Sequence, residues 1–130
     1  MKIWNLPLVE YLPFDELEED SPIIVVTSEG AFEAVADDLA QLNIVSKIKA
    51  TDATIQHFAT LTANLQSSVA GLQSPVIYAV GGGLAVDAAK YIASSLNLPL
   101  TSLPTALSVD AFFTWASGVR HEGCVQYIET

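Results

Sequence analysis

Basic residues are scarce in this chain, and so is cysteine. Only five of its 130 residues are Lys or Arg, against 15 Asp and Glu, which gives a formal net charge of −10 at pH 7. Nucleic-acid backbones are bound by clustered Lys and Arg, so this charge argues against a nucleic-acid partner. The one cysteine, Cys124, cannot form an internal disulfide, and we expect it to be a small apolar strand residue without a catalytic role.

Long hydrophobic runs are also missing. No apolar segment approaches the roughly 20 residues that cross a bilayer, and residues 1–5 do not begin a signal peptide. We therefore expect a soluble, cytoplasmic protein with no membrane partner. Hydrophobic residues nevertheless make up 51% of the chain and the mean hydropathy is +0.40, which excludes a disordered or fibrous protein and favours one compact α/β domain.

The acidic residues are unevenly distributed. Eleven of the 15 carboxylates lie in residues 1–52, with a cluster over 15–20, and the others are Asp87, Asp110, Glu122 and Glu129. A cluster of this kind is most often a solvated surface segment. We interpret residues 1–21 as an N-terminal strand with an acidic loop, and residues 22–130 as the folded domain.

The apolar pattern alternates between strand and helix. Short apolar runs predict strands over 23–27, 44–49, 76–80 and 98–103, and the partly polar run at 44–49 suits a sheet edge. Helical spacing follows the first three strands, from Phe32 to Leu42, from Ile55 to Leu72 behind a cap at Thr51-Asp52, and from Ala85 to Leu96. This βαβαβα order predicts a Rossmann-like parallel sheet with helices on both faces. Runs at 116–120 and 124–129 on either side of His121-Glu122-Gly123 predict a C-terminal β-hairpin.

Three consecutive glycines, Gly81, Gly82 and Gly83, connect the third predicted strand to a helix rich in alanine. Glycine permits positive φ angles, and the first N–H groups of a helix attract an anion because they have no partner within the helix. The glycines therefore predict a phosphate site at the carboxyl end of a strand. The stretch is neither G-x-G-x-x-G, since position 86 is Val86, nor a P-loop, since no Gly-Lys-Ser/Thr follows. A tight turn without a ligand is the alternative.

Two linked motifs carry a resemblance to a known superfamily. The first is Gly-Gly-Gly-x-x-x-Asp-x-Ala-Lys at 81–90, and the second is Leu-Pro-Thr-Ala-Leu-Ser-Val-Asp at 103–110. Together they resemble the iron-containing alcohol dehydrogenases, glycerol dehydrogenases, glycerol-1-phosphate dehydrogenases and dehydroquinate synthases, with sn-glycerol-1-phosphate dehydrogenase as the nearest branch. The resemblance covers about residues 22–130 and implies the nucleotide-binding N-terminal domain of such an enzyme, with NAD or NADP as cofactor.

The resemblance also implies site residues. The hydroxyls at 105 and 108 would donate hydrogen bonds to the cofactor, position 114 is usually a cofactor-contacting serine, and Asp110 would lie at the substrate. From the residues alone, the two hydroxyls could instead cap loops and Asp110 could cap a helix. The cofactor-binding residues implied are Gly81, Gly82, Gly83, Asp87, Thr105, Ser108 and Thr114.

Cofactor preference stays open between NAD and NADP. Many relatives place an acidic residue directly after the first strand, where it binds the ribose hydroxyls, and this chain has Ser28 there with Glu29 next to it. A neutral residue at this position removes a repulsion from a 2′-phosphate. Either dinucleotide is therefore compatible with the sequence.

In the superfamily a divalent metal, zinc or iron, is held by one Asp and two His of a following helical domain. The two histidines here, His57 and His121, have no carboxylate or second histidine at ligand spacing, so we expect both to be structural or solvent-facing. We expect this chain to lack that domain and to hold no metal and no catalytic residue.

These observations predict the NAD(P)-binding part of a metal-dependent dehydrogenase that acts on a small polyol or polyol phosphate. Such a part would bind the dinucleotide without turning over substrate alone, and its incomplete interdomain surface predicts a homo-oligomer. One alternative is a fragment of a dehydroquinate synthase-like enzyme, although Asp87-Ala88-Ala89-Lys90 looks more like the dehydrogenase branch. The other is a non-catalytic nucleotide-binding or interaction module.

Overall fold

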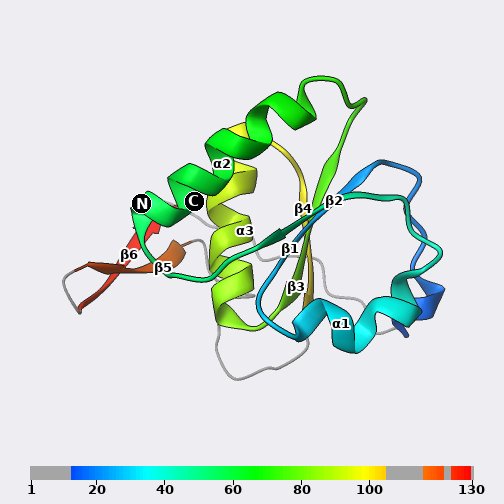
Figure 1. Cartoon of the computed structure of the whole chain (residues 1–130), viewed down its shortest axis with the longest axis horizontal. Coiled ribbons are helices and arrows are strands. Elements are labelled where there is room, and N and C mark those ends of the chain that lie inside the picture. Colours follow the sequence, from blue (N-terminus) through cyan, green and yellow to red (C-terminus); the bar gives the residue numbers. More distant parts are fainter. Residues whose placement is uncertain (1–12, 105–115, 122–123, 130) are drawn as a thin grey trace, which may run out of the picture.

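The computed structural model describes residues 13–104, 116–121 and 124–129 (Figure 1). Its centre is a four-stranded parallel sheet in the order β2-β1-β3-β4, and a separate two-stranded sheet pairs β5 with β6. The strands are β1 (Ile23–Thr27), β2 (Ile44–Lys49), β3 (Val76–Gly81), β4 (Leu100–Pro104), β5 (Ala116–His121) and β6 (Cys124–Glu129). The helices are the 3-10 helices η1 (Phe14–Glu16) and η2 (Ala36–Leu39) and the α-helices α1 (Ala31–Val35), α2 (Ile55–Val69) and α3 (Gly83–Leu96).

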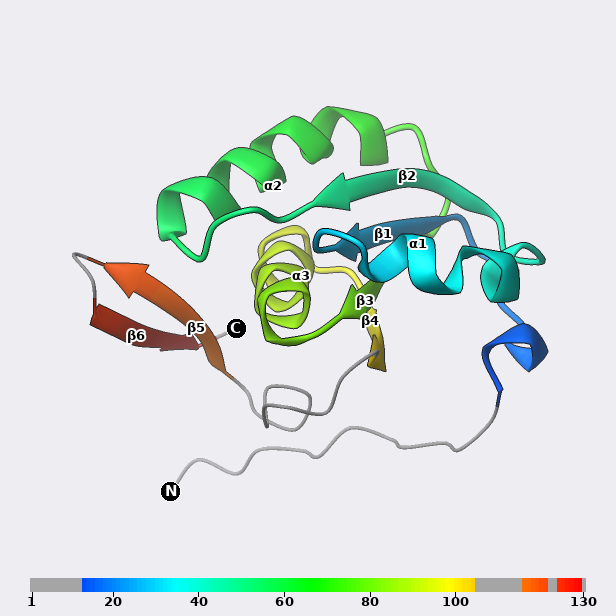
Figure 2. The ribbon, with the colours of Figure 1, turned by 60° about the horizontal axis from the view of Figure 1, so that its bottom comes forward.

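Helices cover both faces of the parallel sheet, as predicted (Figure 2). All five residues of β1 are buried, which is why the strand reads as one continuous β-branched run. Alternate residues of β1 and β3 face opposite ways. One face packs against α2 and α3 through Ile24, Val26, Ile77 and Ala79, and the other packs against η1, α1 and η2 through Ile23, Val25, Tyr78 and Val80.

Small side chains bring α3 close to the sheet. Its alanines at 85, 88, 89 and 93 are all buried, and Ile92 is fully buried in the same cluster. The longer α2 packs on the same layer through Phe58, which is fully buried and lies 5.8 Å from the Tyr91 ring, centroid to centroid. Burying such a side chain contributes about 1.5–3 kcal/mol.

The order of the strands creates a switch point between β1 and β3. From β1 the chain moves outward to β2, and from β3 it moves outward in the other direction to β4. The segments that follow these two central strands lead to helices on opposite faces, α1 and α3. A crevice therefore opens at the carboxyl ends of β1 and β3, which is the position where open α/β sheets bind ligands.

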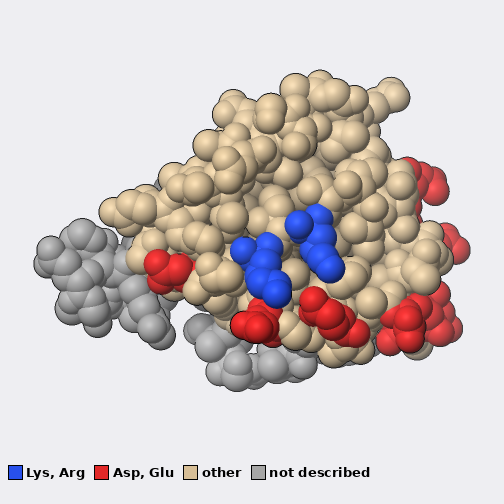
Figure 3. Space-filling view, in the orientation of Figure 1, with Lys and Arg blue, Asp and Glu red and all other residues tan. Residues whose placement is uncertain are grey.

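The prediction that residues 44–49 form an edge strand is confirmed. Along β2, partly buried and exposed residues alternate, and Val45 is 44% exposed. Lys47 lies over the Phe32 ring of α1, with Nζ 4.7 Å from the ring centroid. Figure 3 shows the face of the molecule that is turned toward the viewer in Figure 1, with basic side chains in its middle and acidic side chains along its lower and right-hand edges.

The helix after β1 is shorter than predicted. The apolar positions through Leu42 do pack into one cluster, but α1 ends at Val35, whose φ of −123° and ψ of 7° leave the α-helical region, and the chain continues as η2. At the other end, Gly30 is left-handed with φ 78°, a conformation that favours glycine, and provides no side-chain cap. A helix of this length has little stability of its own and depends on its packing.

The cap of α2 is Thr54, and the predicted cap at Thr51-Asp52 is wrong. The Thr54 hydroxyl accepts a hydrogen bond from the His57 backbone N–H at 3.2 Å. The Asp52 carboxylate supports this cap, because it accepts from the Ala53 N–H at 2.9 Å and from the Thr54 hydroxyl at 3.1 Å. Asp52 thus stabilises the turn that precedes the helix.

The predicted hairpin is confirmed by antiparallel pairing of β5 with β6, which runs from Ala116 opposite Glu129 to His121 opposite Cys124. His121 is therefore the last residue of β5 and is not in the turn. The predicted N-terminal strand falls within residues 1–12, outside the described part of the chain, and η1 occupies part of the acidic segment. Within the residues that the structure describes, no helix combines the length and apolar character needed to cross a bilayer.

Candidate functional site

The three glycines lie at the carboxyl end of a central strand, as predicted. Gly81 ends β3, Gly82 is the N-cap of α3, and Gly83 is the first helical residue. Of the three, only Gly81 has a positive φ, 145°, while Gly82 has extended backbone with φ −92° and ψ −153°. The expectation that glycine is needed here for positive φ angles therefore holds at Gly81 alone.

Gly81 lies at a crowded junction, and Gly82 does not. A Cβ on Gly81 would lie 3.0 Å from the Ala85 Cβ, 3.1 Å from the Ser28 Oγ and 3.3 Å from the Ala31 Cβ. A Cβ on Gly82 would have no heavy atom within 4 Å. The first glycine is thus required by packing, whereas the second leaves its backbone open to an incoming group.

The first turn of α3 has free hydrogen-bond donors. The Val86 N–H donates to the Gly82 carbonyl at 3.1 Å, so the first intrahelical bond begins only there. Among the described residues, no side chain accepts a hydrogen bond from the N–H groups of Gly83, Leu84 or Ala85. These donors, together with the positive end of the helix dipole, can hold a phosphate oxygen.

A pocket of about 440 Å³ opens beside the glycine turn. Residues that follow β1, β2 and β3 line it, so it lies at the carboxyl edge of the sheet and on the β1–β2 side of the turn. Its lining residues are Ser28, Glu29, Ala50, Thr51, Gly82, Gly83 and Leu84.

The wall after β2 is held by two hydrogen bonds. The Ala50 N–H donates to the Thr27 carbonyl at 2.8 Å, and the Thr51 N–H donates to Nε2 of His57 at 3.1 Å. Because Nε2 faces a donor, it carries the lone pair and the ring proton is on Nδ1. His57 is half-buried and has this structural partner, in agreement with the sequence prediction.

From the sequence we expected His57 to be structural or solvent-facing, and we assigned no binding role to Ala50 and Thr51. The signal was nevertheless present, since both residues directly follow a predicted strand and the carboxyl ends of parallel strands meet at one edge.

Other predicted site residues are less well placed or lie outside the described residues. Asp87 is half-buried in the second turn of α3 and does not line the pocket. Thr105, Ser108, Asp110 and Thr114 are not among the residues that the structure describes. Within the described part of the chain, no group of three or more His, Cys, Asp or Glu could hold a metal ion.

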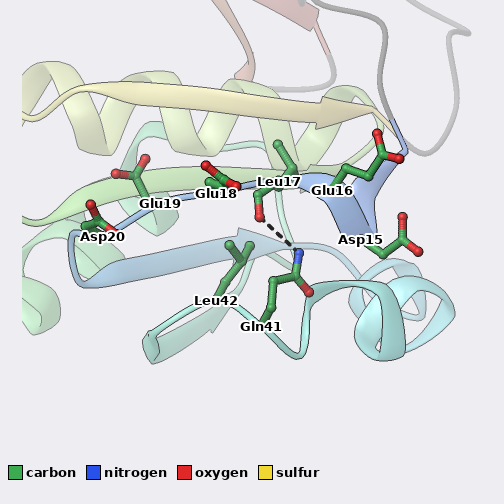
Figure 4. A pocket seen from close by; sticks show the side chains of 8 residues that line it. All are labelled: Asp15, Glu16, Leu17, Glu18, Glu19, Asp20, Gln41 and Leu42. Atoms are coloured by element: carbon green, nitrogen blue, oxygen red, sulfur yellow. Dashed lines mark hydrogen bonds between the residues drawn. The ribbon is translucent and has the colours of Figure 1, made fainter.

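A second pocket, of about 510 Å³, lies beside the acidic segment (Figure 4). The Gln41 amide nitrogen ties this segment down by donating to the carbonyls of Phe14, at 3.0 Å, and Leu17, at 3.2 Å. Five carboxylates line the pocket, and they would repel phosphate groups. The lining residues are Asp15, Glu16, Leu17, Glu18, Glu19, Asp20, Gln41 and Leu42.

Tyr78 joins the acidic segment to β3. Its hydroxyl donates to the Glu19 carboxylate at 3.1 Å, and the side chain is only 3% exposed. Burial first, and then the charge and hydrogen bond of Glu19, raise the pKa of Tyr78 from 10.0 to about 12, while a hydrogen bond from Thr101 acts in the opposite direction. At neutral pH Tyr78 is therefore a protonated donor.

Comparison with known proteins gives a family match over most of the chain. The model of a family described as iron-containing alcohol dehydrogenase matches residues 10–128. Glycerol-1-phosphate dehydrogenase (NAD(P)+) of Metallosphaera sedula is 31% identical over 106 residues, which are 78% of this chain and 29% of that protein.

Solved structures give the same picture of the fold. The crystal structure of glycerol dehydrogenase from Schizosaccharomyces pombe matches with 28% identity and a TM-score of 0.66, over 84% of this chain and 28% of that one. A 2-deoxy-scyllo-inosose synthase complexed with carbaglucose-6-phosphate, NAD+ and Co2+ matches with 20% identity and a TM-score of 0.64, over 92% of this chain and 36% of that one. The chain thus spans about a third or less of the length of these relatives.

Proposed function

Because this chain belongs to the iron-containing alcohol dehydrogenase family, we propose that it is the part of such an enzyme that binds NAD or NADP, with the cofactor pyrophosphate on the glycine turn. The observation that carries this proposal is the pairing of an unobstructed Gly82 with the free N–H groups of α3. A pyrophosphate needs close approach to backbone donors, and a side chain at position 82 would fill that approach.

The position and the size of the pocket support a dinucleotide as its ligand. The pocket lies at the switch point of the sheet, where ligands of this fold class bind, and a volume of about 440 Å³ is within the usual range for ligand pockets. Its only described carboxylate, Glu29, lies at the end of β1, where it can accept hydrogen bonds from ribose hydroxyls. The pocket near residues 15–20 is lined by five carboxylates, which repel phosphate groups, and this favours the glycine turn as the phosphate site.

The proposed reaction is hydride transfer between the cofactor and a small polyol or polyol phosphate. The substrate class follows from the name of the Metallosphaera sedula relative, a glycerol-1-phosphate dehydrogenase, and from the glycerol dehydrogenase of Schizosaccharomyces pombe. When bound, the nicotinamide ring supplies the hydride chemistry. In this proposal Thr105, Ser108 and Thr114 bind the cofactor, and Asp110 binds the substrate.

The described residues do not provide a metal centre. We assign this part of the chain the roles of binding and orienting the dinucleotide. The dehydroquinate synthase-like alternative shares the fold, but the glycerol-1-phosphate dehydrogenase of Metallosphaera sedula and the glycerol dehydrogenase of Schizosaccharomyces pombe have higher sequence identities, 31% and 28%, than the 2-deoxy-scyllo-inosose synthase, 20%.

Calorimetric titration of the 130-residue chain with NAD and with NADP tests the proposal. We expect binding by the wild-type chain and loss of binding in Gly82→Val, because the branched side chain would occupy the approach to the backbone donors. Gly71→Val is the matched control, since a Cβ at Gly71 also meets no heavy atom within 4 Å and this residue lies in the turn before β3, at the opposite edge of the sheet. Absence of binding by the wild-type chain, or equal binding by Gly82→Val, contradicts the proposal.

A further inference from the structure

We propose that His57 is a positioning residue for the adenosine half of the dinucleotide site, through the hydrogen bond that its Nε2 accepts from the Thr51 N–H. This inference rests on the proposed function. It concerns a helix residue that is outside the pocket lining and far in sequence from the glycine turn.

The position of the pocket decides which half of the cofactor it would hold. A dinucleotide with its pyrophosphate on Gly82 and Gly83 extends one nucleoside toward β1 and β2 and the other toward β4. The pocket lies on the β1–β2 side, lined by Ser28, Glu29 and Thr51. In dinucleotide sites an acidic residue near a strand end accepts hydrogen bonds from the ribose hydroxyls of the adenosine half, and Glu29 lines this pocket, so we place the adenosine on this side.

The loop from Ala50 to Thr54 forms the outer wall of the adenosine side. Its residues are held in place by different hydrogen bonds. Ala50 is buried and bonded to β1 through its own N–H. Thr54 and Asp52 are fixed by the cap of α2. Thr51 lies between these two anchors with an exposed side chain, and among the described residues the only acceptor for its N–H is His57. The His57 ring therefore sets the position of the loop residue that lines the pocket.

His57 is itself well placed for this task. Its backbone N–H bonds to the cap residue Thr54, which fixes the first turn of α2, and its ring lies 6.4 Å from that of Phe58, centroid to centroid. The ring also approaches the Thr51 hydroxyl, with 3.5 Å between Nε2 and Oγ1. A glutamine side chain can place a carbonyl acceptor near the position of Nε2, whereas phenylalanine keeps a ring but offers no acceptor.

The experiment compares His57→Gln and His57→Phe by calorimetric titration with ADP-ribose, which carries the adenosine half, and with NMN, which carries the nicotinamide half. Loss of one neutral hydrogen bond corresponds to weaker binding by about three- to tenfold, so we expect this loss for ADP-ribose in His57→Phe. We expect His57→Gln to bind ADP-ribose within about twofold of wild type, because the acceptor is restored. NMN binding should be the same in all three proteins. Gln56→Phe, at an exposed neighbouring position on α2, controls for the aromatic substitution.

The outcomes separate the two proposals. If the wild-type chain binds ADP-ribose and His57→Phe binds it equally well, or if His57→Gln is as weak as His57→Phe, the positioning role is wrong and the proposed function stands. If the wild-type chain binds neither dinucleotide nor ADP-ribose, both the proposed function and this inference are wrong. Melting curves are recorded for each variant. Loss of the folded state in both His57 variants overturns the inference, since the histidine would then serve folding alone.

Discussion

Gly81→Ala tests whether Gly81 is required for packing while the adjacent Gly82 is not. Alanine at position 81 would have to adopt a φ of 145°, a conformation that non-glycine residues rarely occupy, at a cost of about 1–3 kcal/mol. Its Cβ would also lie 3.0–3.3 Å from atoms of Ala85, Ser28 and Ala31, and overpacking of this kind costs about 1–3 kcal/mol. The two effects together predict a loss of about 2–6 kcal/mol in the free energy of unfolding, a large part of the roughly 5–15 kcal/mol that stabilises a typical domain.

Gly82→Ala is the matched comparison. Its φ of −92° and ψ of −153° are extended backbone, and the added methyl group meets no heavy atom within 4 Å, so we expect its unfolding free energy to stay within about 0.5 kcal/mol of wild type. Urea unfolding followed by far-UV circular dichroism measures both variants. Equal stability of Gly81→Ala and wild type, or equal destabilisation by the two variants, would refute the distinction between a packing glycine and an open one.

Tyr78→Phe should make the free energy of unfolding less dependent on pH above pH 9. The pKa of Tyr78 is raised from 10.0 to about 12 in the folded state, so the protonated hydroxyl contributes stability that is fully present below pH 10 and is lost as the pH rises toward 12. The wild-type chain should therefore lose up to about 2–3 kcal/mol more than Tyr78→Phe between pH 9 and pH 12 in urea unfolding, and parallel losses would contradict the assignment. Glu29→Gln should raise the affinity for NADP relative to that for NAD by about two- to fivefold in calorimetry, because the exposed Glu29 carboxylate in the pocket wall repels a 2′-phosphate. The control Glu33→Gln lies outside the pocket and should leave the ratio of the two affinities unchanged. Thr54→Ala should lower the unfolding free energy by about 1 kcal/mol through loss of the α2 cap, whereas the exposed Thr60→Ala should have little effect; equal losses would argue against the cap.

Strands were predictable from sequence because they are short apolar runs bounded by turn residues. β1 is a run of five buried residues, and β2 showed its edge position through alternating polar residues. The extent of α1 was not predictable, because the apolar spacing through Leu42 is the same whether the chain continues as one helix or changes at Val35 to a 3-10 turn. Periodicity reports which side chains face the core and says little about the backbone between them.

The glycine turn between β3 and α3 was predictable as a motif, but the different surroundings of its glycines were not. Gly81 and Gly82 are adjacent identical residues, and only the surrounding atoms of Ser28, Ala31 and Ala85 distinguish the crowded position from the open one. The position of Thr51 directly after a predicted strand places it at the carboxyl edge of the sheet, but its hydrogen bond to His57 depends on how the loop after β2 folds back on α2, which no local pattern indicates.

The most direct test of the central claim is an amide NMR titration of the ¹⁵N-labelled 130-residue chain with NAD. We predict that the largest shifts fall on the amides of Gly82, Gly83 and Leu84, with smaller shifts at Ser28 and Thr51, because these backbone groups surround the proposed pyrophosphate and adenosine positions. Shifts confined to the acidic segment at 15–20, or no shifts at saturating cofactor, would contradict the assignment of the glycine turn as the dinucleotide site.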